Sequence, residues 1–321
     1  ISATGGATYE FFLNGSSVQG PSANSSYSST SFANGDLIHA MVISAAGCSA
    51  LSSDITMVVH SLPIPTLTSS DADNSICEAT PVTFTAGGGT MYEFFLNNIS
   101  QGAPSPTNQY INSSLADGDA VQVMVTDLNS CSATATPIVT AVTPNVGVPA
   151  FNSGASELCV GGVSTYQATA SNSAGIVYSI VSGGASINST TGDVFSVISD
   201  FTVRATATGI NGCGVETADK AVTVHALPTV DLGGDQAICE GSMATLDAGT
   251  FASYLWSDNS TNPTLVTGTA GSYSVTVTDG NGCSNTSAPV AIAVNPLPTV
   301  DLGGDQAICE GSMATLDAGT F

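Results

Sequence analysis

Positive charge is almost absent from this chain. Arg204 and Lys220 are its only basic residues, against 25 acidic residues in 321, and the formal net charge is −23 at pH 7. Such a balance repels the phosphates of nucleic acids and the surfaces of anionic membranes, so we expect neither as a partner. A strongly acidic surface with few charges of the other sign is typical of a soluble, exported protein.

Long apolar runs and aromatic residues are also scarce. No stretch of 18 apolar residues occurs, which predicts that the chain does not insert into a membrane. Aromatic residues make up 6% of the sequence, too few for a row of exposed sugar-stacking platforms. Trp256, the single tryptophan, follows Cys239 by 17 residues, as Phe94 follows Cys77. We interpret this as the core aromatic position of an Ig-like sandwich.

The chain contains repeats. The stretch LPTVDLGGDQAICEGSMATLDAGTF occurs at 227–251 and again at 297–321, and identity over 25 residues indicates recent duplication within a tandem array. Proline-containing joints separate further copies. These landmarks predict modules at 1–62, 63–145, 146–226 and 227–296, with 297–321 opening a fifth. Because Ile1 aligns with Leu246, inside a strand, we expect the first module to be N-terminally truncated and the true N-terminus to lie upstream.

Within the modules apolar residues recur with a period of two, as in strands with one buried face. Examples are Val121, Val123 and Val125 before one cysteine, and Ala244, Leu246 and Ala248 after another. Turn dipeptides such as Asn34-Gly35 and Asp279-Gly280 separate the runs. The pattern predicts an all-β fold of tandem antiparallel β-sandwich modules, without helices, arranged as an elongated array.

The segments ICEGSMATLDAG, YLWS and GSYSVTVTDGNGC resemble the Ig-like and PKD-like repeats of giant Bacteroidota cell-surface proteins. The gliding-motility adhesins, which are exported by the type IX secretion system, carry such repeats. The similarity is greatest over 227–296 and weakest over 146–226. It implies that the predicted β-sandwiches are tandem Ig-like or PKD-like modules, that they lie outside the cell or on its surface, and that the repeats contain no catalytic residues. We therefore expect no enzyme.

Eight cysteines, two per complete module, predict disulfides, since no C-x-x-C pair or cysteine–histidine cluster suggests zinc. The spacings favour one bridge inside each module, because Cys77–Cys131 and Cys159–Cys213 are both separated by 54 residues and Cys239–Cys283 by 44. Cys48 and Cys309 would then pair outside this stretch of chain. A second scheme stays open, because a bridge needs Cα atoms within about 7 Å. If the two cysteines of a module lie at opposite ends, the first cysteine of one module could join the second of the next, for example Cys77 with Cys213.

Acidic turns are the one candidate ligand site. Carboxylates there could offer oxygens to Ca²⁺, although none forms a complete calcium-loop motif. The candidates are Asp71, Asp73, Asp117, Asp119, Asp231 and Asp235. Calcium is thus a possible ligand and no other cofactor is expected. The histidines His39, His60 and His225 belong to no Ser-His-Asp arrangement; we place His39 toward solvent and the other two at joints.

We favour a stalk segment of a large secreted or surface-anchored adhesin, whose partners are neighbouring modules and the cell surface or extracellular polysaccharide. One alternative is a filament in which residues 297–321 donate strands to the first module of another copy, pairing Cys309 with Cys48. We rank it lower because residues 1–6 align with 316–321, which a donated strand would duplicate. The other alternative is a set of polysaccharide-binding accessory modules of a secreted hydrolase.

Overall fold

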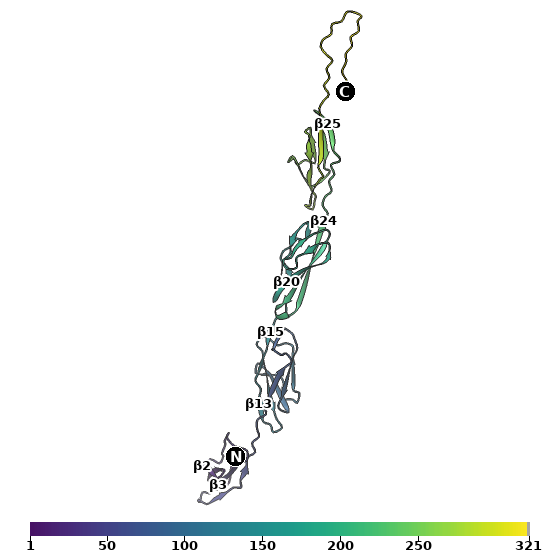
Figure 1. The fold of residues 1–321 in the computed structure, drawn as a ribbon. Helices are drawn as coiled ribbons and strands as arrows, with labels where there is room; N and C mark the ends of the chain where they lie inside the picture. Colours follow the sequence, from purple (N-terminus) through teal and green to yellow (C-terminus); the bar gives the residue numbers. More distant parts are fainter. Residues whose placement is uncertain (320–321) are drawn as a thin grey trace. The chain divides into compact units, whose positions relative to one another are not determined.

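The computed structural model describes residues 1–319, and its regular structure is all-β apart from one 3₁₀ turn at Ile210–Gly212 (Figure 1). It divides into two compact units, Ile1–Asn145 and the chain from Val146 onward. Each module consists mostly of antiparallel strands around its own apolar core, which confirms the predicted tandem β-sandwich class.

Residues 1–62 form one five-stranded sheet of order β2-β1-β3-β4, with β5 also paired to β3. Tyr9, Phe11 and Ala40 form its small core, against which Ala3 packs, and Ser2 forms an isolated bridge with Ser26. The strands are β1 (Thr8–Leu13), β2 (Ser16–Ser22), β3 (Leu37–Ile43), β4 (Ser49–Leu51) and β5 (Ile55–Thr56).

Residues 63–145 form a fuller sandwich. One sheet has the order β10-β9-β12-β13 with β14 beside β12, a second has the order β11-β8-β6, and β15 pairs with β7 in parallel. Val82 and Phe84 of β8 pack with Val123 of β12 in one buried cluster, as the alternation predicted. The strands are β6 (Thr66–Ser69), β7 (Ser75–Cys77), β8 (Val82–Gly87), β9 (Met91–Leu96), β10 (Ile99–Ser100), β11 (Gln109–Asn112), β12 (Ala120–Thr126), β13 (Ser132–Thr134), β14 (Ile138–Val139) and β15 (Ala141–Thr143).

Residues 146–226 have a four-stranded sheet of order β17-β24-β23-β20, a three-stranded sheet of order β18-β22-β21, and the pair β16-β19. Tyr166 and Val203 are completely buried between them. The strands are β16 (Ala150–Phe151), β17 (Glu157–Cys159), β18 (Ser164–Thr165), β19 (Ala168–Thr169), β20 (Ser173–Gly183), β21 (Ser186–Ile187), β22 (Asp193–Phe195), β23 (Phe201–Gly209) and β24 (Val215–His225).

Residues 227–296 are built from three small sheets, β25-β32-β29, β26-β28 and β27-β30-β31. Leu246, Trp256 and Val275 lie at the centre of their shared core, so the predicted core position of Trp256 is confirmed. The strands are β25 (Gln236–Cys239), β26 (Ala244–Asp247), β27 (Ser253–Trp256), β28 (Thr264–Thr267), β29 (Gly271–Tyr273), β30 (Val275–Thr278), β31 (Ser284–Thr286) and β32 (Val290–Asn295).

Residues 297–319 of the second copy of the repeat do not fold like the matching residues of the first. Residues 297–319 contain no strand and are exposed, whereas the same sequence at 227–249 forms β25 and β26. In the first copy these strands pair with β32 and β28, which have no counterparts within 297–319. The sequence therefore needs the rest of its module to become strand.

Candidate functional site at the joint between modules three and four

The first cysteine of each of modules two to four lies at the end of a strand that pairs in parallel with the last strand of the same module. Cys77 is opposite Thr143, Cys159 opposite His225, and Cys239 opposite Asn295. The next residue in each case donates its N–H to the carbonyl of that partner, at 2.8–3.0 Å. These strand-end cysteines therefore lie where the chain leaves their module.

The second cysteine of each module lies in a tight turn between two strands. In two modules an aspartate fixes this turn, because Asp127 Oδ1 accepts the N–H of Cys131 and Asp279 Oδ1 that of Cys283, both at 2.9 Å. The residue before the cysteine is left-handed, as in Ser130 with φ 66°. The glycines that hold the matching place in the other turns satisfy the same requirement without strain. We call Cys48, Cys131, Cys213 and Cys283 the hairpin cysteines.

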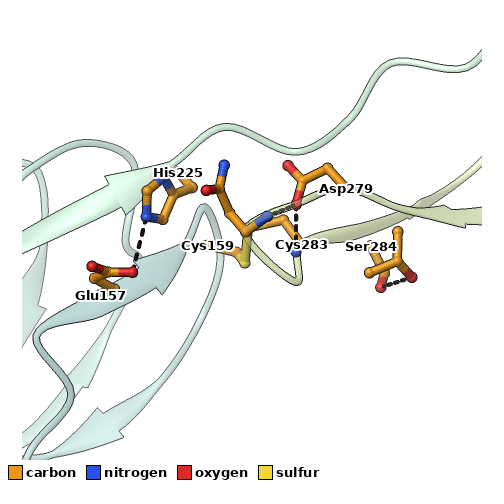
Figure 2. Close-up of a disulfide and its surroundings, with 8 residues drawn as sticks. Glu157, Cys159, His225, Asp279, Cys283 and Ser284 are labelled. Atoms are coloured by element: carbon orange, nitrogen blue, oxygen red, sulfur yellow. Dashed lines mark hydrogen bonds and ion pairs between the residues drawn. A yellow bond between two sulfur atoms is a disulfide. The ribbon is translucent and has the colours of Figure 1, made fainter. Parts of the chain in front are cut away.

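A disulfide joins the strand-end cysteine of module three to the hairpin cysteine of module four. Cys159 and Cys283 have Cα atoms 5.6 Å apart and are separated by 124 residues in sequence (Figure 2). The chain-entropy model gives a loop of this size a stabilisation of about 5 kcal/mol. The prediction that Cys159 pairs with Cys213 and Cys283 with Cys239 is therefore wrong.

The length of β24 explains why Cys159 and Cys213 do not pair with each other. Cys159 is opposite the last residue of this strand, His225, and Cys213 lies two residues before its first, Val215. At about 3.3 Å per residue, β24 places the two cysteines roughly 33 Å apart, far beyond the reach of a disulfide of about 7 Å. The bridge must therefore leave the module.

The remaining cysteines also depart from the predicted scheme. Cys77 and Cys213 are disulfide-bonded. Cys131 and Cys239, which we predicted to be bridged within their modules, carry free thiols, so the remaining predicted bridge, Cys77–Cys131, is wrong as well. Cys48 and Cys309 are also free within this chain, and their pairing elsewhere stays a prediction.

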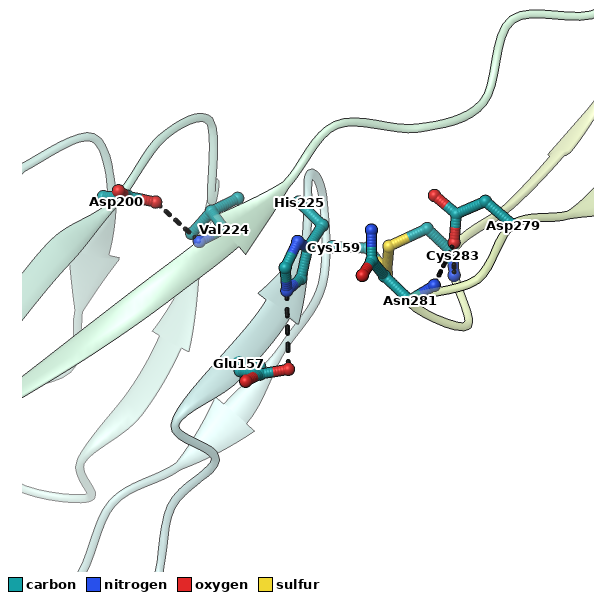
Figure 3. A network of polar contacts seen from close by, with 8 residues as sticks. All are labelled: Glu157, Cys159, Asp200, Val224, His225, Asp279, Asn281 and Cys283. Carbon is teal, nitrogen blue, oxygen red and sulfur yellow. Dashed lines mark hydrogen bonds and ion pairs between the residues drawn. A yellow bond between two sulfur atoms is a disulfide. The ribbon is translucent and has the colours of Figure 1, made fainter.

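Polar contacts hold both sides of the bridge (Figure 3). His225 Nε2 lies 3.4 Å from Glu157 Oε2, and the Asp200 carboxylate accepts the N–H of Val224 at 2.7 Å, so the end of β24 is fixed from two sides. On the module-four side of the joint, Asn285 Nδ2 donates to the carbonyl of Pro228 at 2.8 Å. These bonds restrain the short connection of Ala226–Pro228 independently of the disulfide.

An open cleft of about 690 Å³ lies beside the joint. Its lining includes His225, Leu227, Pro228, Phe251, Asp279 and Asn281. Histidine and aspartate are the titratable residues in this lining, but His225 contacts Glu157 and Asp279 holds the hairpin turn. The arrangement provides a polar joint rather than a nucleophile with its base.

The six aspartates proposed for calcium all accept hydrogen bonds in turns or between strands. Asp71 and Asp73 accept from Ser75, Asp117 from Val142, Asp119 from Asn97 and Ala116, Asp231 from Gly233, and Asp235 from Ala291. Among residues 1–319, no three acidic, histidine or cysteine side chains gather as a metal site. Calcium binding stays a prediction without a preformed cluster to support it.

Both basic residues lie in module three and form hydrogen bonds there. The Arg204 guanidinium forms two bonds of 2.7 Å to Asp219, which lower the pKa of that carboxyl and raise the pKa of Arg204. Lys220 donates to the carbonyl of Gly154. His39, predicted to face solvent, is instead partly covered, because it stacks on Phe12 and contacts Asp54 at 2.9 Å. His60 is exposed.

No protein-family model and no curated protein matches this chain. Among solved structures it is similar to the N-terminal eight Ig domains of Down syndrome cell adhesion molecule, with 16% identity and a TM-score of 0.40. That match covers 90% of this chain and 45% of the other, so the chain spans less than half of that structure. An I-band fragment of titin matches with 10% identity and a TM-score of 0.41, over 74% of this chain and 100% of the fragment.

The fibronectin(III)-like modules of Clostridium thermocellum CbhA match with 10% identity and a TM-score of 0.30, over 51% of this chain and 95% of theirs. The Ig-like assignment itself rests on the strands and cores described above. No helix within residues 1–319 has the length and apolar character needed to cross a bilayer.

Proposed function

We propose that this chain is a structural, non-catalytic stalk segment of a large secreted or surface-anchored bacterial adhesin. Its modules serve to hold a binding domain at a distance from the cell. The resemblance of the repeats to Bacteroidota surface proteins supports an extracellular or cell-surface place and export by the type IX secretion system. The acidic, disulfide-containing sequence is compatible with that place.

The observation that carries the proposal is the Cys159–Cys283 bridge. A disulfide inside a module stabilises that module alone, whereas this one ties two consecutive modules together across their joint. Such a bond limits how far the modules can separate when the ends of the chain are pulled apart. That property is useful in a load-bearing array.

Small-angle X-ray scattering on the oxidised chain tests the proposal. A compact protein of this length would have a radius of gyration of about 20 Å. Four modules, each as long as the 11-residue strand β24, would span about 145 Å end to end and give a radius of gyration of about 40 Å. A value near that of the compact protein would overturn the stalk proposal.

The polysaccharide-binding alternative has less support. It requires rows of exposed aromatic side chains. Among residues 1–319, Phe195 is the one aromatic residue that is largely exposed. Specific binding by residues 1–145 on a glycan array would nevertheless reverse the ranking. Calcium, other copies of the chain and the cell surface remain proposed partners.

A further inference from the structure

We propose that Cys239 is a docking position for the hairpin cysteine of a following module of the same kind. The Cys159–Cys283 disulfide is then one example of a general arrangement in which one disulfide, which we call a staple, closes each joint between modules. We call this arrangement the staple rule. The inference rests on the proposed stalk function and specifies how its modules are linked.

Cys239 has the same local structure as Cys159. Both end a strand that pairs in parallel with the last strand of the module, opposite Asn295 and His225 respectively. Both precede a turn closed by a bond from residue +3 to the cysteine carbonyl, at 2.9 Å for Ser242 and 2.8 Å for Gly162. The difference is that Cys159 holds a partner, whereas the thiol of Cys239 is free and exposed.

The chain beyond Cys239 repeats the chain beyond Cys159. In module three one residue, Ala226, lies between His225 and Leu227, where the joint begins; in module four one residue, Pro296, lies between Asn295 and Leu297. The 25 residues that start at Leu297 are identical to those that start at Leu227. A module completed after them would therefore begin at the same place relative to Cys239 as module four does relative to Cys159.

The occupant is defined by the partner that Cys159 accepts. It is a turn of the form Asp-Gly-Asn-Gly-Cys, in which the Asp279 carboxylate takes the N–H groups of Asn281 and Cys283 and Gly282 has φ 81°. The same cysteine of module four cannot serve Cys239, because Cys159 already binds it. The thiol of Cys239 consequently needs a hairpin cysteine from outside module four.

The covalent step joins two thiols. Two S–H bonds break, one bond forms between the Sγ atoms, and the two protons and two electrons that are released pass to an oxidant. A small disulfide such as oxidised glutathione supplies that oxidant by thiol–disulfide exchange and leaves as two thiols. The free, exposed position of Cys239 allows the initial attack.

The exact repeat makes a direct test possible. A second copy of residues 252–296 is appended after Phe321, so that residues 297–321 become the start of a complete duplicate of module four. The extended chain is equilibrated in a glutathione redox buffer, denatured, alkylated and weighed intact to count free thiols. The unextended chain has four, at Cys48, Cys131, Cys239 and Cys309.

The proposal predicts three free thiols in the extended chain, at Cys48, Cys131 and Cys309, because the copied hairpin cysteine takes Cys239. Two matched variants identify the partner. With Cys239→Ser the count rises to four, since the copied cysteine loses its partner, and with Cys309→Ser it falls to two. The opposite pattern, two with Cys239→Ser and four with Cys309→Ser, means a bridge inside the new module and overturns the proposal.

Five free thiols in the extended chain would overturn it as well, because the copied cysteine would then have no partner at all. So would a count of two in both variants, which would place the copied cysteine on Cys48 or Cys131. Scattering from the same samples separates this inference from the stalk proposal. A large radius of gyration with the wrong thiol counts refutes the staple rule alone, whereas a compact particle refutes the stalk.

Discussion

Trp256 illustrates how far single residues were predictable. Its spacing from Cys239 placed it in the core, and its side chain is 1% exposed with the indole N–H donating to the carbonyl of Asn262 at 2.8 Å. Burial follows from alternation along one strand, so local sequence is enough to find it. The partner of a cysteine depends instead on which end of the module each sulfur occupies, and that depends on strands far away in sequence.

Replacing Trp256 with alanine should destabilise module four by about 3–5 kcal/mol, because it removes the largest buried side chain of that core and leaves a cavity. Differential scanning calorimetry of the whole chain can follow the transition of this module without relying on tryptophan fluorescence. Leu255→Ala is the matched control, since Leu255 precedes it in β27 and is 52% exposed. Equal losses in both variants would contradict the assigned faces of the strand.

Strand β24 is the element that explains why the predicted cysteine pairs differ from the observed disulfide. Ala218, Val222 and Val224 lie at alternate positions of its sequence, and this alternation predicts a strand with one inward face. Its parallel partner β17 was not predictable, since a three-residue strand carries little pattern of its own. Because β17 ends beside the end of β24, the strand-end cysteine faces the next module. The equal separation of 54 residues between the two cysteines of modules two and three therefore led to the wrong pairing. The limit on the Cα–Cα distance, which left a bridge between modules open, agrees with the observed Cys159–Cys283 bond.

Strand β20 offers a test of local backbone geometry at the scale of one element. Gly183 has φ 94°, and a Cβ built on it would lie 1.9 Å from the carbonyl oxygen of Asp200. Gly183→Ala should therefore destabilise module three by about 1–3 kcal/mol through backbone strain and steric clash. Thermal or denaturant unfolding measures the change.

Gly175 provides the control within the same strand, because its φ is not left-handed and a Cβ there would meet no atom within 4 Å. We expect Gly175→Ala to change the free energy of unfolding by less than about 1 kcal/mol, in the stabilising direction. If Gly183→Ala were equally harmless, the close approach of β20 to Asp200 would not exist in solution.

At the scale of the whole molecule, the staple changes how module pairs respond to force. Handles attached at residues 146 and 296 by chemistry that spares thiols would pull on modules three and four together. With the Cys159–Cys283 bond intact, the 124-residue separation between the two cysteines is bypassed, so unfolding releases only the short segments outside the loop. Reduction should add about 430 Å of extension, at about 3.3–3.6 Å for each released residue.

The double variant Cys159→Ser/Cys283→Ser should show the long extension with or without reductant. Equal extensions of the oxidised and reduced wild-type chain would mean that the bridge does not carry load.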